Sequence, residues 1–181
     1  MDLYTERLLL RPWKEMDAES LYEYAKDPRV GPIVGWPVHT SVRNSRDIIK
    51  NLLSNEENYA ICLKKDERPI GCVSLMIGGA SSLNLTDKQG EIGFWIGVPF
   101  WGNGLVPEAV NELIRYGFEE LNLEKIWCRY FDGNIKSKRV QEKCGFKYKT
   151  TRENVYVELM DEIRTEHINV LNNNEWKKVN I

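Results

Sequence analysis

The chain has 181 residues, 42% of them hydrophobic, which suits one compact domain with its own core, and we predict a single domain over residues 1–181. The net charge is only −2 and aromatic residues are spread throughout, so the composition favours neither nucleic-acid binding nor disorder. The N-terminus has no apolar signal core, and no apolar run approaches the roughly 20 residues of a membrane span. We therefore expect a cytoplasmic protein without a membrane partner.

Apolar and breaker residues divide the first part of the chain into a strand, two helices and a loop. Residues 7–13 predict a strand, and a helix follows with Asp17 as its N-cap. Glycines and prolines over residues 31–39 predict a loop. A second helix is expected over residues 41–54, with an apolar face that includes Leu52.

The rest of the chain alternates between strands and helices. The predicted strands cover residues 59–63, 70–77, 91–98 and 125–131, and an antiparallel pair begins at residue 146. The predicted helices cover residues 103–121 and 134–143, and Gly145 stands where a left-handed helix stop is expected. This order predicts an α/β fold in which helices cover a mixed sheet. The terminal strand pair offers a surface for a homodimer.

Four cysteines, at positions 62, 72, 128 and 144, bear on redox state and metal binding. None forms a C-x-x-C pair, so the spacing favours neither a zinc site nor a thioredoxin-like site, and we expect no metal. Because Cys62 and Cys72 lie in apolar runs, we expect reduced thiols that pack as small hydrophobic side chains.

The segment from Gly93 to Ala109 carries the clearest functional signal, because a buried strand runs into a glycine turn and a helix starts at once. The first helical turn leaves N–H groups unpaired, and the helix dipole makes that end partly positive. Glycine at positions 102 and 104 removes the Cβ atoms that would block close approach. The pattern predicts a phosphate site, although by itself it also fits an ordinary strand-to-helix connection. The turn lacks the Gly-Lys-Ser/Thr of a P-loop and the third glycine of a dinucleotide fingerprint.

Three segments resemble the GNAT acetyltransferases. The residues from Pro99 to Ala109, Pro-x-x-Gly-x-Gly-x-x-x-Glu-Ala, resemble motif A of that family, and those from Asn134 to Phe146 resemble motif B. The opening Thr5-Glu-Arg-Leu-Leu-Leu-Arg is similar to the RimJ/RimL-like branch, which contains protein N-terminal acetyltransferases. The resemblance implies a GNAT fold, with a mixed, mostly antiparallel central sheet flanked by helices.

The resemblance also implies that acetyl-CoA is the co-substrate. Ile96 and Val98 would pair through their backbone with the pantetheine arm, and Asn134 would bond the same arm. The pyrophosphate would lie on the backbone N–H groups of Gly102, Asn103, Gly104, Leu105 and Val106. The basic residues between positions 136 and 149 either meet the 3′-phosphate or form a solvated helix face.

Acetyl transfer to an amine needs a neutral amine, a stabilised oxyanion and a protonated leaving thiol. Glu91 is the candidate base, acting through water, and the alternative is a structural carboxylate at the start of a strand. Many relatives place a tyrosine acid where this chain has Gln141. Ser137 is therefore the candidate acid, and the alternative is a helical serine that bonds a nearby carbonyl.

The acceptor is the part of the reaction that the sequence describes least. Trp36, in the loop over residues 31–39, is the candidate acceptor-binding residue, and it either stacks on the acceptor or fills the core. We expect an N-acetyltransferase for a primary amine, with a protein N-terminus as the first acceptor to consider. The alternatives are a small-molecule amine (an aminoglycoside, a polyamine or an amino acid), a non-catalytic acyl-CoA-binding module favoured by Gln141, and a nucleotide-binding protein.

Overall fold

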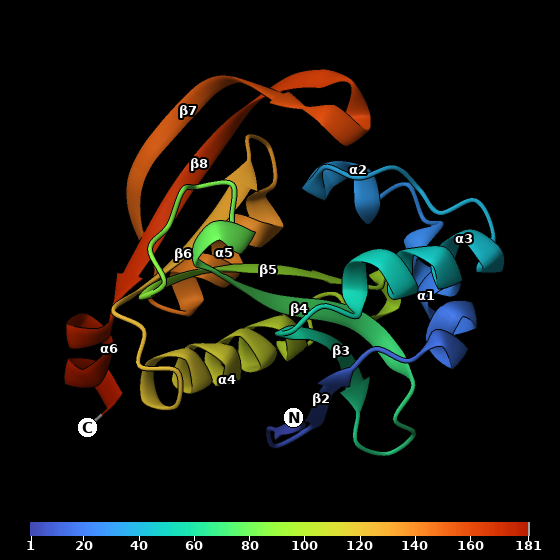
Figure 1. Cartoon of the computed structure of the whole chain (residues 1–181), viewed down its shortest axis with the longest axis horizontal. Helices are drawn as coiled ribbons and strands as arrows, with labels where there is room; N and C mark the ends of the chain where they lie inside the picture. Colours follow the sequence, from blue (N-terminus) through green and yellow to red (C-terminus); the bar gives the residue numbers. More distant parts are fainter. Residues whose placement is uncertain (181) are drawn as a thin grey trace.

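The computed structural model of the chain describes residues 1–180 and shows an eight-stranded sheet with helices on both faces (Figure 1). The strands are β1 (Leu3–Tyr4), β2 (Leu8–Pro12), β3 (Asn58–Leu63), β4 (Pro69–Ile77), β5 (Gln89–Ile96), β6 (Lys125–Phe131), β7 (Lys147–Val157) and β8 (Glu162–Asn172). The α-helices are α1 (Ala18–Ala25), α2 (Gly31–Val34), α3 (Val42–Ile48), α4 (Leu105–Glu119), α5 (Ile135–Lys143) and α6 (Asn173–Asn180). None of the helices described is long and apolar enough to cross a membrane.

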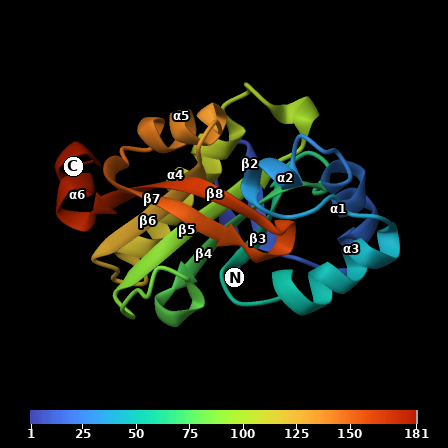
Figure 2. The same cartoon turned by 90° about the horizontal axis from the view of Figure 1, so that it is seen from above.

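The strands follow the order β1-β2-β3-β4-β5-β6-β8-β7, and β5 with β6 is the one parallel pair within residues 1–180. The predicted mixed, mostly antiparallel sheet is therefore confirmed. The β5–β6 pairing runs only from Gln89 with Lys125 to Ile92 with Cys128, whereas β5 stays paired with β4 as far as Ile96. Figure 2 shows β4, β5 and β6 lying next to one another. The second half of β5 thus has one free edge, on the side of β6.

Helices bury two separate apolar cores against the sheet. The stripe predicted for α4 packs on one face, where Val110 and Leu113 are fully buried and Gly117 lets the helix approach β6 closely. On the other face, α1 and the turn after α3 bury a second cluster that includes Trp13 and Ile49. Burial of each such side chain stabilises the fold by about 1.5–3 kcal/mol.

Three local predictions near the N-terminus differ from the structure. Asp17 stands at the predicted N-cap position of α1, but its carboxylate makes no capping bond to the helix: it pairs with the buried guanidinium of Arg11 at 2.7 Å and accepts from the Lys14 N–H. The predicted loop over residues 31–39 begins with the short helix α2, which ends at Gly35 with a φ of 97°. The helix expected over residues 41–54 changes to a π-helical turn after Ile48, which leaves Leu52 exposed.

The C-terminal half follows its prediction closely. Gly145 has a φ of 84° directly after α5, which confirms the left-handed stop. Strands β7 and β8 form a long hairpin that rises above the rest of the sheet, and its tip lies across from α2 (Figure 1). Arg164 of β8 donates to the Pro32 carbonyl at 2.7 Å, which ties the hairpin to α2. The sequence prediction did not include α6, and the homodimer stays a prediction.

Candidate active site

The turn between β5 and α4 has the backbone conformation that an anion site needs. Gly102 and Gly104 have φ angles of 78° and 74°, in the left-handed region that favours glycine. A Cβ at Gly102 would meet no heavy atom within 4 Å, so this side of the turn is open. Gly104 is the N-cap of α4, and no side chain caps the helix. Among residues 1–180 the N–H groups of Asn103, Gly104, Leu105 and Val106 have no hydrogen-bond partner, which leaves them free for an anion.

The N-terminal segment holds the opposite side of this turn. Arg7 donates to the Asn103 carbonyl at 3.0 Å and pairs with Glu108 at 2.6 Å, and the Thr5 hydroxyl donates to Glu108 at 2.5 Å. Burial alone would raise the pKa of Glu108, but the hydrogen bonds from Thr5 and Arg7 outweigh burial and lower that pKa. Thr5 and Arg7 of the Thr-Glu-Arg opening therefore position the glycine turn and neutralise Glu108 in the first turn of α4.

A cleft of about 620 Å³, here called the α4–α5 cleft, extends from the glycine turn along the end of β5 to α5. Lys136, Arg139 and Lys143 line it, whereas Lys138 and Lys147 pair with acidic neighbours on the surface. The basic segment is thus divided between the two readings of the sequence. Three of its six cations face the cleft, and the other three, Lys138, Lys147 and the exposed Lys149, form part of the solvated surface.

The free edge of β5 forms one wall of the α4–α5 cleft. The Cys128 thiol donates to the Ile92 carbonyl at 3.1 Å, so the backbone of Ile92 faces β6. Because backbone groups alternate along a strand, those of Phe94 and Ile96 also face this side, where the β6 pairing has ended. The Ile96 carbonyl accepts from the Trp101 indole at 3.0 Å. Within residues 1–180 the Ile96 N–H and both backbone groups of Phe94 have no protein partner, and the sequence pattern did not single out Phe94.

Val98 lies beyond the end of β5, so the predicted strand boundary at residue 98 is wrong. Pro99 has no N–H, and Val98 to Phe100 form a 3₁₀ turn in which the Val98 carbonyl accepts from the Trp101 N–H at 3.1 Å. Any pairing of Val98 with a ligand would therefore use its N–H.

Asn134, Ser137 and Gln141 of the α5 region form one buried group beside the cleft. The Asn134 side-chain oxygen accepts from the Ser137 N–H at 3.1 Å and caps α5, which leaves its NH₂ group for a ligand. Gln141 donates to the Ser137 hydroxyl at 3.1 Å and to the Arg129 carbonyl, also at 3.1 Å. Because the Ser137 oxygen is the acceptor, its own proton is free to point into the cleft. Gln141, which stands where many relatives have a tyrosine, thus orients the hydroxyl group of Ser137, the candidate acid.

Glu91 is buried in a network of charged side chains. Its carboxylate accepts from Arg129 at 2.5 Å and from the Ser81 hydroxyl at 2.5 Å. Arg129 also pairs with Glu166 at 3.2 Å, and Glu166 is bound in turn by Arg152. Both readings of Glu91 therefore stay open: the contacts fix it structurally, and it also lines a cavity in which a base would work.

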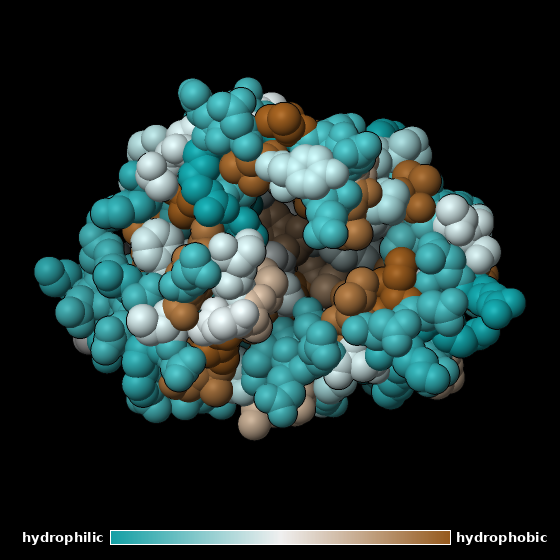
Figure 3. Space-filling model, turned by 45° about the horizontal axis from the view of Figure 1, so that its top comes forward, coloured by the Kyte–Doolittle hydropathy of each residue, from teal (hydrophilic) through white to brown (hydrophobic). Residues whose placement is uncertain are grey.

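A second hollow, of about 330 Å³ and here called the inner cavity, lies between β5, β6 and α2. Phe94, Trp95, Asn134 and Ser137 line both this cavity and the α4–α5 cleft, so the two spaces meet at β5 and α5. Figure 3 shows that the face carrying the hairpin is hollowed at its centre and apolar inside. An amine in the inner cavity could approach a group held in the cleft.

Trp36 both packs against protein and lines the inner cavity. Its ring lies edge-on to Trp95 at 5.8 Å and is tilted against His39 at 5.2 Å. A Cβ on Gly31 would lie 2.3 Å from the Trp36 ring, so only glycine allows this packing. The two readings of Trp36 are therefore compatible, because one side of the ring fills the core and the other remains for an acceptor.

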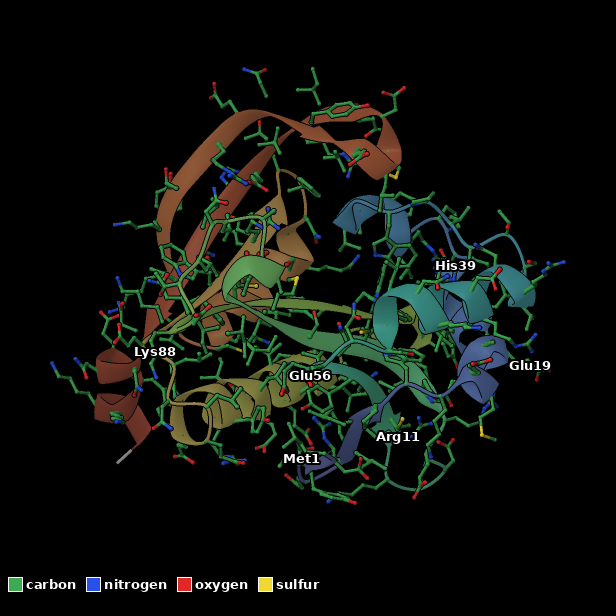
Figure 4. All side chains as sticks on the ribbon, viewed as in Figure 1. Met1, Arg11, Glu19, His39, Glu56 and Lys88 are labelled. Carbon is green, nitrogen blue, oxygen red and sulfur yellow. The ribbon has the colours of Figure 1, made fainter. Side chains whose placement is uncertain are left out.

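His39 supports Trp36 from the loop between α2 and α3, beside α1 (Figure 4). Its Nδ1 is 2.8 Å from the Ser45 hydroxyl, and burial lowers its pKa below the ordinary value of 6.5. Since the unfolded chain takes up this proton first as pH falls, the neutral ring stabilises the fold fully above about pH 6.5 and less as pH falls through the lowered pKa.

A His39→Gln variant is therefore expected to show a flatter loss of stability between pH 7.5 and 5.5 than the wild type. Urea unfolding at each pH measures this difference. Equal slopes for the two proteins would show that His39 is not the titrating group.

The cysteines do not provide a nucleophile at neutral pH. Burial raises the pKa of Cys72, which lines the inner cavity, and that of Cys144 at the end of α5, each to about 12. Thiols with such values stay protonated near pH 7. This favours direct attack by the acceptor over an acyl-cysteine intermediate.

Comparisons with known proteins agree with this architecture. Residues 7–147 match the family model described as an acetyltransferase (GNAT) domain. The chain is 34% identical over 149 residues to an uncharacterized N-acetyltransferase, p20, of Bacillus licheniformis, which covers 80% of this chain and 81% of the relative.

Two solved structures share the fold. A putative ribosomal-protein-serine acetyltransferase from Vibrio cholerae is 20% identical, with a TM-score of 0.78 over 95% of this chain and 97% of that one. The microcin C7 self-immunity acetyltransferase MccE, solved with acetyl-CoA and AMP, is 22% identical, with a TM-score of 0.72 over 92% and 93% of the two chains. With the family model matching most of its length, the chain belongs to the GNAT family of acetyltransferases.

Proposed function

We propose that this N-acetyltransferase moves the acetyl group of acetyl-CoA directly to a primary amine, and that an α-amino group is its first acceptor to test. The observation that carries the proposal is the meeting of two spaces at β5. The α4–α5 cleft begins at an open phosphate-type turn, and the inner cavity begins where the cleft ends. Acetyl-CoA fits the first space and an amine the second.

The residues of the α4–α5 cleft suit each part of acetyl-CoA. The pyrophosphate would lie on the N–H groups from Gly102 to Val106, in a turn where Gly102 and Gly104 carry no Cβ that would block its approach. The Phe94 carbonyl and the Ile96 N–H would pair with the pantetheine amides, and the Asn134 NH₂ group would bond a pantetheine oxygen. Arg139 and Lys143 line the cleft where a further phosphate would find cations.

The chemistry is an attack of the amine on the thioester carbon, with loss of the thiol. Glu91 would take the proton of the attacking amine through water. The Phe94 N–H, on the free edge of β5, would stabilise the negative charge on the carbonyl oxygen. Ser137, oriented by Gln141, would donate its hydroxyl proton to the leaving sulfur, and the proton taken up at Glu91 would return to Ser137 through water. The products are an amide and coenzyme A.

Calorimetric titration of acetyl-CoA followed by an assay of thiol release with amines tests this function. Micromolar binding and amine-dependent thiol release are expected. Binding without turnover on any amine would favour the acyl-CoA-binding module, and an absence of binding would overturn the whole proposal.

We also propose that the chain belongs to the RimJ/RimL-like branch, because its opening segment has a structural role at the cofactor turn. An Arg7→Met variant is expected to lower kcat/KM for acetyl-CoA on the order of 10-fold. The variant loses the hydrogen bond to the Asn103 carbonyl that positions the turn, and it leaves the charge of Glu108 without a partner beside the phosphates. With S-acetylpantetheine, which has no pyrophosphate, kcat/KM should change less than twofold.

Arg68→Met is the matched control, because Arg68 forms a similar exposed pair with Glu23 at 3.1 Å away from the cleft. It should leave both donors unchanged. Adding Glu108→Gln to Arg7→Met should restore part of the loss. An equal loss for the two donors would mean that Arg7 supports the fold in general and not the phosphate turn.

A further inference from the structure

The inner cavity is walled by apolar side chains from six parts of the chain that only the fold brings together. They are Ile33 and Val34 of α2, Trp36, Leu53, Met76 of β4, Phe94 and Trp95 of β5, and Tyr130 and Phe131 of β6. These side chains are partly exposed rather than covered by protein, and Ile33 is 44% exposed. An apolar group entering the cavity would remove this surface from water, which favours its binding.

The charged groups of the inner cavity are already matched within the protein. Its ionised side chains are Glu91, Glu166 and Arg129. All four carboxylate oxygens have partners, since Glu91 is bound by Arg129 and Ser81, and Glu166 is bound by Arg129 and Arg152. The cavity therefore holds no carboxylate without a partner for a second or third ammonium group, and burying an unmatched cation is costly.

The inner cavity also has a connection to the outside. A larger hollow of about 690 Å³, here called the outer cavity, shares Ile33 and Phe131 with it. The charged side chains of Arg29, Asp132 and Arg164 line the outer cavity. A chain continuing from the acceptor could lie there, between α2 and the β7–β8 hairpin.

We propose that the inner cavity takes the α-amino group of a residue with a bulky apolar side chain and discriminates against polyamines and aminoglycosides. This inference rests on the proposed acetyl transfer and names its acceptor class. The apolar side chain occupies the cavity, and the single amine reaches the junction at Phe94 and Ser137. Apolar surroundings also favour the neutral form of an amine, which is the form that attacks. The acceptor is either a free amino acid derivative or the N-terminus of a peptide.

The test compares kcat/KM for thiol release, at saturating acetyl-CoA, over a panel of amines. The panel contains leucinamide, phenylalaninamide, glycinamide, spermidine, kanamycin and tetrapeptides that begin with leucine or glycine. The leucine and phenylalanine amides are expected to exceed glycinamide by about 10–100-fold, and spermidine and kanamycin to fall below glycinamide. A tetrapeptide beginning with leucine that surpasses leucinamide would assign the outer cavity to a peptide chain, and the reverse order would assign the acceptor to a free amine.

A pair of methionine variants ties the selectivity to the cavity. Met76→Glu places a carboxylate in the cavity wall, so kcat/KM for leucinamide should fall at least 10-fold while the Kd for acetyl-CoA changes less than twofold. Met16→Glu makes the same change at a residue that is 82% exposed and should alter neither value. Retained acetyl-CoA binding shows that Met76→Glu has folded, and Trp36→Ala, which enlarges the cavity, replaces it if that binding is lost. The expected result for Trp36→Ala is a lower kcat/KM for leucinamide.

The outcomes separate this inference from the function on which it rests. Turnover that is fastest with spermidine or kanamycin, or equal for glycinamide and leucinamide, would overturn the acceptor class and leave acetyl transfer standing. Acetyl-CoA binding without turnover on any member of the panel would also overturn it. Failure to bind acetyl-CoA at all would remove the proposed function itself.

Discussion

A Gly104→Leu variant is expected to weaken acetyl-CoA binding on the order of 100-fold. Gly104 has a φ of 74° and is the N-cap of α4, beside N–H groups that have no hydrogen-bond partner among residues 1–180. A leucine there strains the left-handed backbone and places a side chain where the pyrophosphate would lie, so several charge-assisted hydrogen bonds are lost together. Calorimetric titration of acetyl-CoA into the variant and the wild type measures the change.

Gly145→Leu is the matched control for backbone strain. Gly145 has a φ of 84°, and a Cβ there would make only an ordinary contact of 3.8 Å with Leu171. Both variants should lose about 1–2 kcal/mol of unfolding free energy, because the left-handed conformation costs a side chain that much. Only Gly104→Leu should lose the ligand. If both variants bind acetyl-CoA like the wild type, the phosphates do not lie on this turn.

The second large effect is expected at Glu91. A Glu91→Gln variant should lower kcat by about 10²–10³-fold, since general-base catalysis contributes factors of this size. The amide oxygen can still accept from Arg129, and the amide NH₂ group can donate to the Ser81 hydroxyl, the two groups that bind the carboxylate at 2.5 Å. The Kd for acetyl-CoA should therefore not change. Without the base, only amine molecules that are already neutral can react. Below the pKa of the acceptor amine, the residual kcat/KM should therefore increase about tenfold for each unit by which the pH is raised.

Glu166→Gln is the matched control, because Glu166 is equally buried, lines the same cavity and also pairs with Arg129. It should lower kcat by roughly tenfold or less, if its role is to hold Arg129. Similar losses for the two variants would indicate that the charge network acts as a unit. A loss of less than about threefold at Glu91 would mean that positioning of the amine provides most of the rate.

Local sequence signals predicted the parts of the site that depend on neighbouring residues. The glycine turn needs left-handed backbone at two positions, and glycine at positions 102 and 104 is the residue type that allows it. The start of α5 was similarly readable, because Asn134 caps the helix that carries Ser137. Helix and strand periods gave most element boundaries, and the exceptions arose where proline or a π-helical turn interrupted the pattern, as at Pro99 and Ile49.

The partners of the candidate catalytic residues could not be predicted in this way. Arg129 reaches Glu91 because β5 and β6 pair in parallel, and these residues are 38 positions apart in the chain. Arg7 reaches Asn103 over 96 positions, and a charged residue near the N-terminus gave no sign of that contact. Pairing register and the packing of α4 decide both contacts.

By itself, the sequence determined the α/β class, the order of most elements, the open phosphate-type turn and the resemblance to the GNAT acetyltransferases, because each depends on local conformation or on residues close together in the chain. Only the tertiary structure decided where β5 parts from β6, how Gln141 orients Ser137, and that Trp36 and Met76 share a cavity with matched charges. Those features depend on pairing between distant segments and on which side chains the folded core leaves exposed. Neither can be predicted from a local pattern of residues.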